Sequence, residues 1–175
     1  MSTTNLTPTS YLVLGCLAVA GPATPYELKQ MVAAGIGYFW SFPHSQLYSE
    51  PARLTEAGLV AEAREHGGRR RRRFSITEAG RQALQEWLAD PTAEVTDIRD
   101  IGLLKLFFGS LADREQIVSL AISQRDAHQE RLDVYVGFES QGTDTPAGAT
   151  LRLGLAYERA AVVFWQSVAE KPPVP

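Results

Sequence analysis

The chain has 175 residues, of which 45% are hydrophobic, and its formal net charge at pH 7 is −3. This length suits one domain or two small ones, and the apolar fraction suffices for a folded core. A membrane span is not expected, because no run of about eighteen apolar residues occurs. The N-terminus lacks the basic region and cleavage site of a signal peptide. A single cysteine, Cys16, excludes an internal disulfide, fits a reducing cytoplasm and is interpreted as a buried thiol.

Charge is distributed unevenly along the chain. Residues 1–90 contain 9 Lys and Arg against 8 Asp and Glu, whereas residues 91–175 contain 8 against 12. Five arginines are consecutive, from Arg69 to Arg73. A weakly acidic body with such a local basic segment can still bind a DNA duplex, and the body disfavours loose non-specific association.

Two helix starts open the chain, and in each a threonine precedes a proline. Thr7-Pro8 predicts a capped helix that runs to Ala20 and is broken by Gly21-Pro22. This helix is apolar nearly all round, which indicates burial on more than one side. Thr24-Pro25-Tyr26-Glu27 is a capping box and predicts a second helix to about Ala34. Four side chains of the second helix are expected to face inward: Tyr26, Leu28, Met31 and Val32.

An aromatic segment, residues 38–42, leads into a third helix. Its rings are expected to wedge the second and third helices together, although a ligand-binding or base-stacking role is an alternative. Ser41 is a candidate cap ahead of Pro43. In the third helix Leu47, Pro51 and Leu54 recur at helical spacing and should pack inward. The opposite face carries Ser45, Gln46, Ser49 and Arg53.

The third helix is followed by signals for a β-hairpin. Gly58 should end the helix, since glycine enters the left-handed conformation at little cost. Residues 59–64 alternate as a strand would, His66-Gly67-Gly68 indicates a tight turn, and residues 72–76 bring back a second strand with Phe74 and Ile76 on one face. The arginine run alone would also fit a solvated surface or a nuclear localisation patch. The full order of helix, stop, strand, turn and basic strand predicts a winged helix-turn-helix.

A further helix is expected after the hairpin, from Thr77 to about Asp90, where Asp90-Pro91-Thr92 ends it. We place a domain boundary there, with a DNA-binding domain over residues 1–90 and a helical domain over residues 91–175. The apolar face of this helix comprises Ala83, Leu84, Trp87 and Leu88.

The second domain is expected to be entirely α-helical. Three helices are predicted over residues 97–108, 113–138 and 149–169, with Asp113 as the cap of the second and a polar, Gly- and Pro-containing loop over residues 139–148. The last helix has two apolar faces, which predicts that one packs on its own subunit and the other on a second copy. One face comprises Leu151, Leu155, Val162 and Trp165, and the other Leu153, Tyr157, Ala160 and Phe164.

Residues for catalysis or metal binding do not form a pattern. The three histidines, at 44, 66 and 128, fall in different regions, and no Cys-x-x-Cys, His-x-x-x-His or Gly-x-Ser-x-Gly motif occurs. No glycine-rich phosphate loop with a following lysine is present. The helical carboxylates are interpreted as solvated faces and caps. We therefore expect neither an enzyme nor a cofactor or metal.

Several segments resemble the PadR family of bacterial transcription repressors. They are Tyr26-Glu27-Leu28, Ser45-Gln46-Leu47-Tyr48, Gly58-Leu59-Val60 and residues 74–80, and they cover about the first half of the chain. The resemblance implies a cytoplasmic homodimer that dimerises through its C-terminal region, represses transcription and is released from DNA by a small aromatic or hydrophobic effector. Pro51 departs from the family pattern, which more often has leucine there, and a proline can kink the helix or delay its start.

These observations predict a specific DNA interface. The first turn of the third helix should read base edges through His44, Ser45, Gln46 and Ser49; glutamine can pair with adenine. Tyr48 is either a phosphate contact or a core residue, and the arginines should hold phosphates or enter the minor groove. The predicted DNA contacts are His44, Ser45, Gln46, Tyr48, Ser49, Arg53, Arg69, Arg70, Arg71, Arg72 and Arg73.

A small-molecule pocket is predicted in the C-terminal domain, lined by Tyr157, Phe164 and Trp165. The alternative for these rings is ordinary packing at a dimer interface. For the whole chain, the alternative to a DNA-binding repressor is a winged-helix module that binds an acidic protein partner through its basic hairpin.

Overall fold

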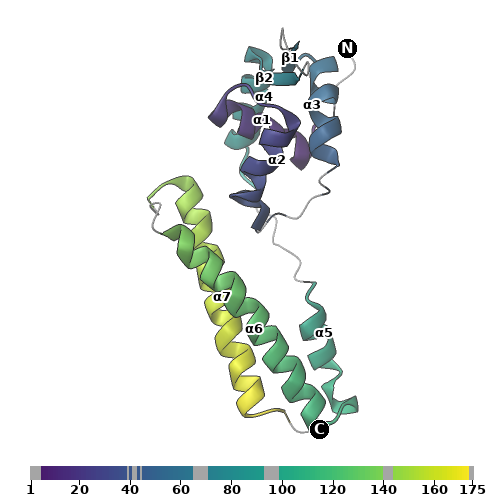
Figure 1. The fold of residues 1–175 in the computed structure, drawn as a ribbon, viewed down its shortest axis with the longest axis vertical. Coiled ribbons are helices and arrows are strands. Elements are labelled where there is room, and N and C mark those ends of the chain that lie inside the picture. The colour runs from purple at the N-terminus through teal and green to yellow at the C-terminus, as the bar shows by residue number, and fades with distance from the viewer. Residues whose placement is uncertain are drawn as a thin grey trace. The chain divides into compact units, whose positions relative to one another are not determined.

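The computed structural model describes residues 5–38, 40, 43, 45–64, 71–92, 99–139 and 144–173. The chain forms two compact units, Met1–Glu94 and Val95–Pro175. The first contains four α-helices and a two-stranded sheet among its described residues, and the second contains three α-helices (Figure 1). The predicted fold class, mainly α with a two-stranded wing and a helical C-terminal region, is confirmed.

The first two helices begin where their sequence caps predict. Helix α1 (Pro8–Ala20) is capped by Thr7, whose side chain accepts a hydrogen bond from the Ser10 backbone N–H. Helix α2 (Pro25–Ala33) has a complete capping box, in which the Thr24 N–H donates to Glu27 Oε2 over 2.7 Å. Each cap satisfies backbone donors that the first helical turn leaves without an intrahelical partner.

The third helix begins later than predicted. A short 3₁₀ helix, η1 (Ile36–Tyr38), follows α2, and α3 spans Gln46–Glu56 with Ser45 at the capping position. Ser41, the predicted cap, lies outside the described residues, and the residue at the capping position is Ser45 instead. Helix α3 then continues through Pro51, which is buried.

Gly58 ends α3 as predicted, with a positive φ of 74°. The Leu59 N–H donates to the Leu54 carbonyl and the Gly58 N–H to the Thr55 carbonyl. This pair of bonds forms a Schellman motif, which satisfies the last carbonyls of the helix and turns the chain into the sheet.

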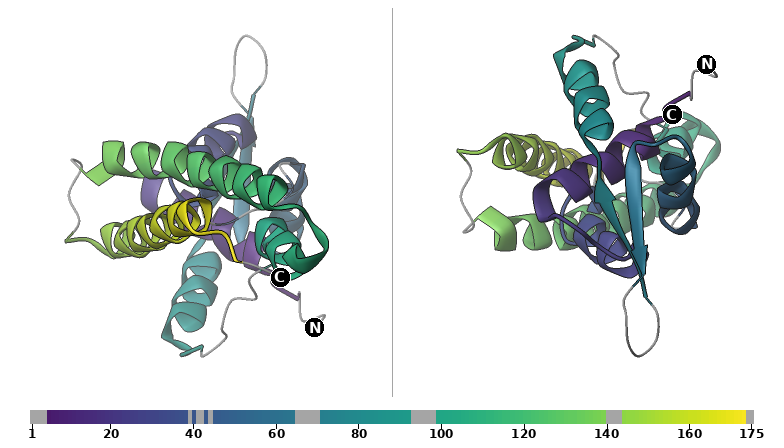
Figure 2. Two further views of the ribbon diagram at one scale, coloured as in Figure 1. Left: turned by 90° about the horizontal axis from the view of Figure 1, so that it is seen from below. Right: turned by 90° about the horizontal axis from the view of Figure 1, so that it is seen from above.

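The wing is an antiparallel pair of strands, β1 (Val60–Arg64) and β2 (Arg72–Ile76), in which Val60 lies opposite Ile76. Figure 2 shows the two strands side by side as a narrow hairpin. Residues 65–70, which hold the predicted glycine turn, lie outside the described residues. Ala23 adds an isolated bridge to β2 by exchanging two backbone hydrogen bonds with Phe74, so the segment before α2 is joined directly to the wing.

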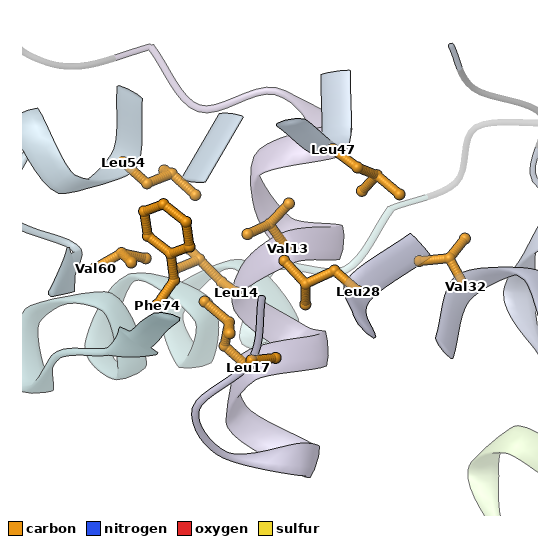
Figure 3. Close-up of a cluster of buried hydrophobic side chains, with 10 residues drawn as sticks. Val13, Leu14, Leu17, Leu28, Val32, Leu47, Leu54, Val60 and Phe74 are labelled. Carbon is orange, nitrogen blue, oxygen red and sulfur yellow. The ribbon is translucent and has the colours of Figure 1, made fainter. Parts of the chain in front are cut away.

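The core of the first unit forms where α1 packs against α2, α3 and the wing (Figure 3). Phe74 is 1% exposed, and the half-buried Cys16 packs at the edge, where burial raises the pKa of its thiol. Deprotonation is therefore disfavoured, as expected of a packing cysteine. The buried cluster comprises Val13, Leu14, Leu17, Ala23, Leu28, Val32, Leu47, Leu54, Val60 and Phe74.

One side chain of this unit that was predicted to face inward is exposed, and part of the apolar face of the last helix is exposed as well. Tyr26 on α2 is 60% exposed, because it sits in the first turn on the side away from Leu28 and Val32. On α4 (Glu78–Ala89), Leu88 is 68% exposed, and Trp87 stacks on Tyr11 at a ring distance of 4.5 Å while remaining 47% exposed.

The second unit is a helical hairpin with a short helix packed on it. Helix α5 (Ile101–Phe107) and the 3₁₀ helix η2 (Gly109–Leu111) precede α6 (Arg114–Glu139) and α7 (Pro146–Glu170). The long helices α6 and α7 lie side by side in Figures 1 and 2. The buried cluster of the unit comprises Ile117, Ala121, Trp165 and Val168.

The structure corrects two boundaries of these helices. Helix α5 starts at Ile101 because the Asp100 side chain accepts hydrogen bonds from the first N–H groups of that helix; residues 97 and 98 are outside the described residues. Helix α7 starts at Pro146 rather than residue 149, because Thr145-Pro146 repeats the cap seen at Thr7-Pro8.

The two faces predicted for α7 are both present. Leu155 and Trp165 are each 1% exposed and pack within the unit, whereas Leu153 is 74% and Phe164 41% exposed. Helix α5 adds further exposed apolar side chains, among them Phe107 at 81%. The second unit therefore presents a large apolar surface in the single chain.

Gly80 offers a test of packing between α4 and the wing. A Cβ at this position would collide with the Leu59 carbonyl oxygen and lie 2.9 Å from Ile76 Cγ1. Gly80→Ala should lower the free energy of unfolding by about 1–3 kcal/mol, although alanine favours helices. Gly15→Ala in α1, where no atom lies within 4 Å of the added Cβ, should instead raise it by about 0.5–1 kcal/mol. Equal effects in urea unfolding at one protein concentration would contradict this packing.

Candidate nucleic-acid interface

The predicted base-reading turn is exposed on α3. Ser45, Gln46 and Ser49 are exposed, while Leu47 and Leu54 on the opposite face are fully buried. Tyr48 is 51% exposed, which decides against the core alternative for this side chain. His44 lies outside the described residues. A polar face of this kind at a helix start, carrying hydroxyl, amide and phenol groups, is suited to contact base edges and phosphates.

Two hydrogen bonds, which we call the α1–α3 ladder, join α3 to α1 on the side of α3 that faces α1. Thr9 Oγ1 donates to Gln46 Oε1 over 2.8 Å, and Ser10 Oγ donates to Glu50 Oε1 over 2.6 Å. Gln46 and Glu50 are four residues apart and therefore lie on one side of the helix. The first bond is exposed and the second is buried.

Glu50 was expected on a solvated face, and the structure corrects this. Its residue is 9% exposed, and it pairs with Arg53, whose Nη2 lies 2.6 Å from Glu50 Oε1. Arg53 also donates to Ser10 Oγ and to the Asn5 carbonyl. Hydrogen bonding by Arg53, supported by Ser10, lowers the pKa of Glu50. The helical spacing could have indicated this burial, because Glu50 falls between Leu47 and Leu54, which both face inward.

These bonds assign Arg53 a structural part that the sequence did not indicate. Its guanidinium uses three nitrogens on partners within the first unit, and its side chain is 38% exposed. A guanidinium committed in this way positions α3 and is a weaker candidate for a DNA contact than the side chains of the first turn.

The described arginines of the wing differ in their contacts. Arg72 binds Glu62 with two hydrogen bonds of 2.8 and 2.7 Å and stacks over the Phe74 ring. Arg73 donates to the Pro22 carbonyl over 2.6 Å and lies 3.9 Å from a Glu27 oxygen. Arg71 is exposed and makes no hydrogen bond or ion pair within the described part of the chain, although its charge contributes to lowering the pKa of Glu27. Arg69 and Arg70 are outside the described residues.

The aromatic segment before α3 is only partly described. Trp40 is 43% exposed, and its backbone N–H donates to the carbonyl of Ile36, the first residue of η1. Phe39 and Phe42 lie outside the described residues, so the predicted wedge between α2 and α3 stays a prediction.

A pocket in the second unit brings together the three predicted effector residues. Its volume is about 300 Å³, and Tyr157, Phe164 and Trp165 all line it. Burial, followed by the negative charges of Asp100 and Glu158, raises the pKa of the Tyr157 phenol. The phenol therefore stays protonated and the surroundings disfavour a further negative charge. The remaining lining residues are Asp100, Leu103, His128, Ala160 and Ala161.

A buried acid lies directly behind this pocket and was missed at the level of sequence. Glu158 is 2% exposed; its Oε2 lies 2.5 Å from His128 Nδ1 and its Oε1 lies 3.5 Å from Arg131 Nη1. The interpretation of helical carboxylates as solvated is therefore wrong here too. The helical spacing could have indicated that Glu158 is buried, because residue 158 lies on the same inward face as Leu151, Leu155, Val162 and Trp165.

Other site types find no support within the described ranges. No group of three or more His, Cys, Asp and Glu residues there could hold a metal ion. No helix among the described residues is both long and apolar enough to cross a lipid bilayer.

Comparison with known proteins adds the family. The model of the transcriptional regulator PadR-like family matches residues 13–86, which include α2, α3, the wing and most of α4. A second model, the virulence activator alpha C-terminal region, matches residues 98–171. The first unit therefore carries a domain of the PadR-like family of transcriptional regulators. Members of this family are regulators of transcription rather than enzymes.

One similar protein is the negative transcriptional regulator PadR of Bacillus subtilis. It is 28% identical over 124 residues, which cover 70% of this chain and 68% of that protein. Its crystal structure in complex with operator DNA matches with a TM-score of 0.82 at 24% identity, over 94% of this chain and 98% of the other. The structure with p-coumaric acid matches with a TM-score of 0.76 at 24% identity, over 92% and 96%. These likenesses confirm the fold over both units.

The Glu50 pair makes the stability of the first unit depend on pH. Because the pKa of Glu50 is lowered in the folded state from its usual 4.5, the pair stabilises above that value and its contribution is lost as pH falls through the folded pKa. Wild type should therefore lose more stability than Glu50→Gln between about pH 5 and pH 3. Glu56→Gln, an exposed change on the same helix, should keep the wild-type pH dependence. Parallel urea-unfolding curves for wild type and Glu50→Gln would contradict the role of the pair.

Proposed function

We propose that this chain is a cytoplasmic, homodimeric repressor of transcription that binds operator DNA and releases it when a small molecule binds. The observation that carries the proposal is the exposed polar turn of α3 in the same compact unit as an arginine-bearing wing. The PadR-like domain and the operator complex of the Bacillus subtilis relative support it.

In this proposal α3 and the wing contact different parts of the DNA. Ser45, Gln46 and Ser49, with His44, contact base edges in the major groove, and Tyr48 donates to a phosphate. Arg69 to Arg73 supply positive charge to the backbone or the adjacent minor groove, and Arg71 is the described member whose guanidinium is uncommitted. Arg53 holds α3 in place through its bonds within the first unit.

Dimerisation is proposed through the exposed apolar faces of α5 and α7. Leu153, Phe107 and Phe164 would leave water when a second copy packs on them, which is a favourable change for apolar surface. A two-fold dimer would present two copies of α3 to half-sites roughly 34 Å apart. A single-chain mass of 19.2 kDa in sedimentation equilibrium at micromolar concentration would contradict this assembly.

The pocket at Tyr157, Phe164 and Trp165 is proposed as the effector site. Its volume of about 300 Å³ and aromatic lining suit a small aromatic molecule. The relative's complex with p-coumaric acid supports an effector of this size class. Release from DNA requires that the effector bind the DNA-free state more tightly than the DNA-bound state.

DNA binding is tested by titrating labelled DNA from upstream of the chain's own gene at two salt concentrations, with a random duplex as control. We expect specific binding that falls steeply with salt, because cationic side chains displace counterions from phosphates. Arg71→Gln should weaken both duplexes equally and reduce the salt slope by about 1. Gln46→Ala should instead reduce the difference between the two duplexes.

The matched control for charge is Arg81→Gln, an exposed change on α4 outside the wing. It should leave the salt slope unchanged. If no duplex binds in a salt-dependent way, DNA binding fails and the protein-binding alternative is favoured. If Arg71→Gln and Gln46→Ala affect specific and random DNA alike, the division between helix and wing is wrong.

The effector site is tested by fluorescence of Trp165 in a Trp40→Phe, Trp87→Phe background. We expect quenching or a spectral shift with an aromatic probe, and a larger response to benzyltrimethylammonium than to p-coumaric acid, since Asp100 and Glu158 make the pocket negative. Phe164→Ala should weaken the response, whereas Val136→Ala, an exposed change on α6 outside the pocket, should not. No response to either probe would count against the pocket.

A further inference from the structure

His128 is the most deeply buried polar side chain that lines the pocket of the second unit. It is 9% exposed, against 44% for Tyr157, and Asp100 is half-buried. The Tyr157 hydroxyl and the Asp100 carboxylate can therefore stay in contact with water. A ring as buried as that of His128 has little water to satisfy its two nitrogens, so each of them needs a partner from the protein or from a ligand.

Glu158 is the partner of one ring nitrogen. Its Oε2 lies 2.5 Å from His128 Nδ1, and the carboxylate is itself 2% exposed, with Arg131 Nη1 3.5 Å from its other oxygen. An ionised carboxylate only accepts hydrogen bonds, so Nδ1 carries a proton and donates it to Glu158. A histidine held at one nitrogen by a carboxylate has its other nitrogen oriented for a further contact.

The other ring nitrogen, Nε2, makes no hydrogen bond within the described part of the chain. It is still accessible, because no fully buried side-chain nitrogen or oxygen in the described ranges is left without a partner. His128 lines the pocket, and its ring lies 6.1 Å from the ring of Tyr157, another lining residue. The accessible edge of the imidazole therefore opens into the pocket.

We propose that His128 Nε2 is the atom that recognises the effector, that Glu158 is the positioning residue for this contact, and that the effector is an uncharged aromatic ring with a hydroxyl group. A phenol hydroxyl suits Nε2 in both protonation states, because it donates to a bare nitrogen and accepts from a protonated one. The negative charges of Asp100 and Glu158 disfavour an aromatic carboxylate in the same place. The inference rests on the proposed effector pocket.

The hydroxyl is required because an apolar ring of the same shape would leave Nε2 unpaired. Such a ring would contact Phe164 and Trp165 equally well, but it would displace the water that reaches Nε2 and replace none of its hydrogen bonds. A site with a buried polar group rejects an analogue that lacks the matching group for this reason.

The test compares 4-ethylphenol with 4-ethyltoluene, which has a methyl group in place of the hydroxyl. Both are titrated against the full chain, with Trp165 fluorescence as the signal in the Trp40→Phe, Trp87→Phe background. We expect 4-ethylphenol to bind about fivefold more tightly, the factor expected for one hydrogen bond, although 4-ethyltoluene is the more hydrophobic probe.

Replacing the buried pair should reverse this order. His128→Phe combined with Glu158→Leu exchanges both polar side chains for apolar ones, which folded proteins often tolerate, and its urea midpoint shows whether it is folded. In this double variant 4-ethyltoluene should bind more tightly than 4-ethylphenol.

The positioning part of Glu158 is tested by two single variants. Glu158→Gln keeps an oxygen that accepts from Nδ1 and should retain the preference for 4-ethylphenol. Glu158→Leu removes the acceptor, so the two probes should bind equally, with the affinity for 4-ethyltoluene unchanged. Loss of affinity for both probes alike would instead indicate a structural effect and contradict the positioning part.

Nitrogen NMR of wild-type protein with isotope-labelled histidine observes the contact directly. The signals of His128 are those that disappear in the double variant. We expect 4-ethylphenol to shift the Nε2 signal more than 4-ethyltoluene does, and the Nδ1 signal to change less than the Nε2 signal.

The inference is overturned by equal affinities of the two probes in wild type, by a preference for 4-ethylphenol that persists in the double variant, or by a preference lost in Tyr157→Phe instead. Each of these results leaves the effector pocket standing, since Trp165 still responds to aromatic probes. If neither probe changes Trp165 fluorescence, the proposed pocket fails and this inference fails with it.

Discussion

The carboxylate of Glu50 is the constraint on which the placement of the third helix depends. A nearly buried charge destabilises a fold unless hydrogen bonds and an opposite charge replace its water. Ser10 from α1 and Arg53 from the next turn of α3 supply these partners. Sliding α3 by one turn along α1 would leave the carboxylate facing apolar residues. The buried leucines favour contact between the helices, and the charge selects one register for that contact.

The second unit applies the same principle to its long hairpin. Trp165 and Ile117 supply apolar contact between α6 and α7, which alone would tolerate several alignments of two helices of similar length. Glu158 on α7 meets His128 on α6 inside that contact. A displaced alignment would leave Glu158 without partners, so the polar pair selects one alignment, whereas the isoleucine and the tryptophan contribute attraction. Tyr157 and Phe164 are held beside it, which gives the pocket its lining.

Local signals in the sequence were sufficient for most of the fold. The threonine caps at Thr7 and Thr24 and the stop at Gly58 act within a few residues, so helix boundaries there could be predicted. The exposed face of α3 followed from the spacing of Leu47 and Leu54. The partners of Arg72 and Arg73 could not be predicted, because a cross-strand glutamate and the Pro22 carbonyl become neighbours only when the hairpin closes. Glu50 and Glu158 were misread for the same reason: their partners are 40 and 30 residues away in the chain.

The α1–α3 ladder also affects which residues of α3 can be replaced during evolution. Side chains on the outer face of α3 can be exchanged at little cost to folding, because Ser10, Glu50 and Arg53 hold the helix from its inner side. Gln46 is the exception, since its neighbour on α1 shares a hydrogen bond with it. Replacing Gln46 would leave the Thr9 hydroxyl without this partner. Exchange at Gln46 would therefore alter a contact with α1 as well as the outer face of α3, which distinguishes it from exchange at Ser45 or Ser49.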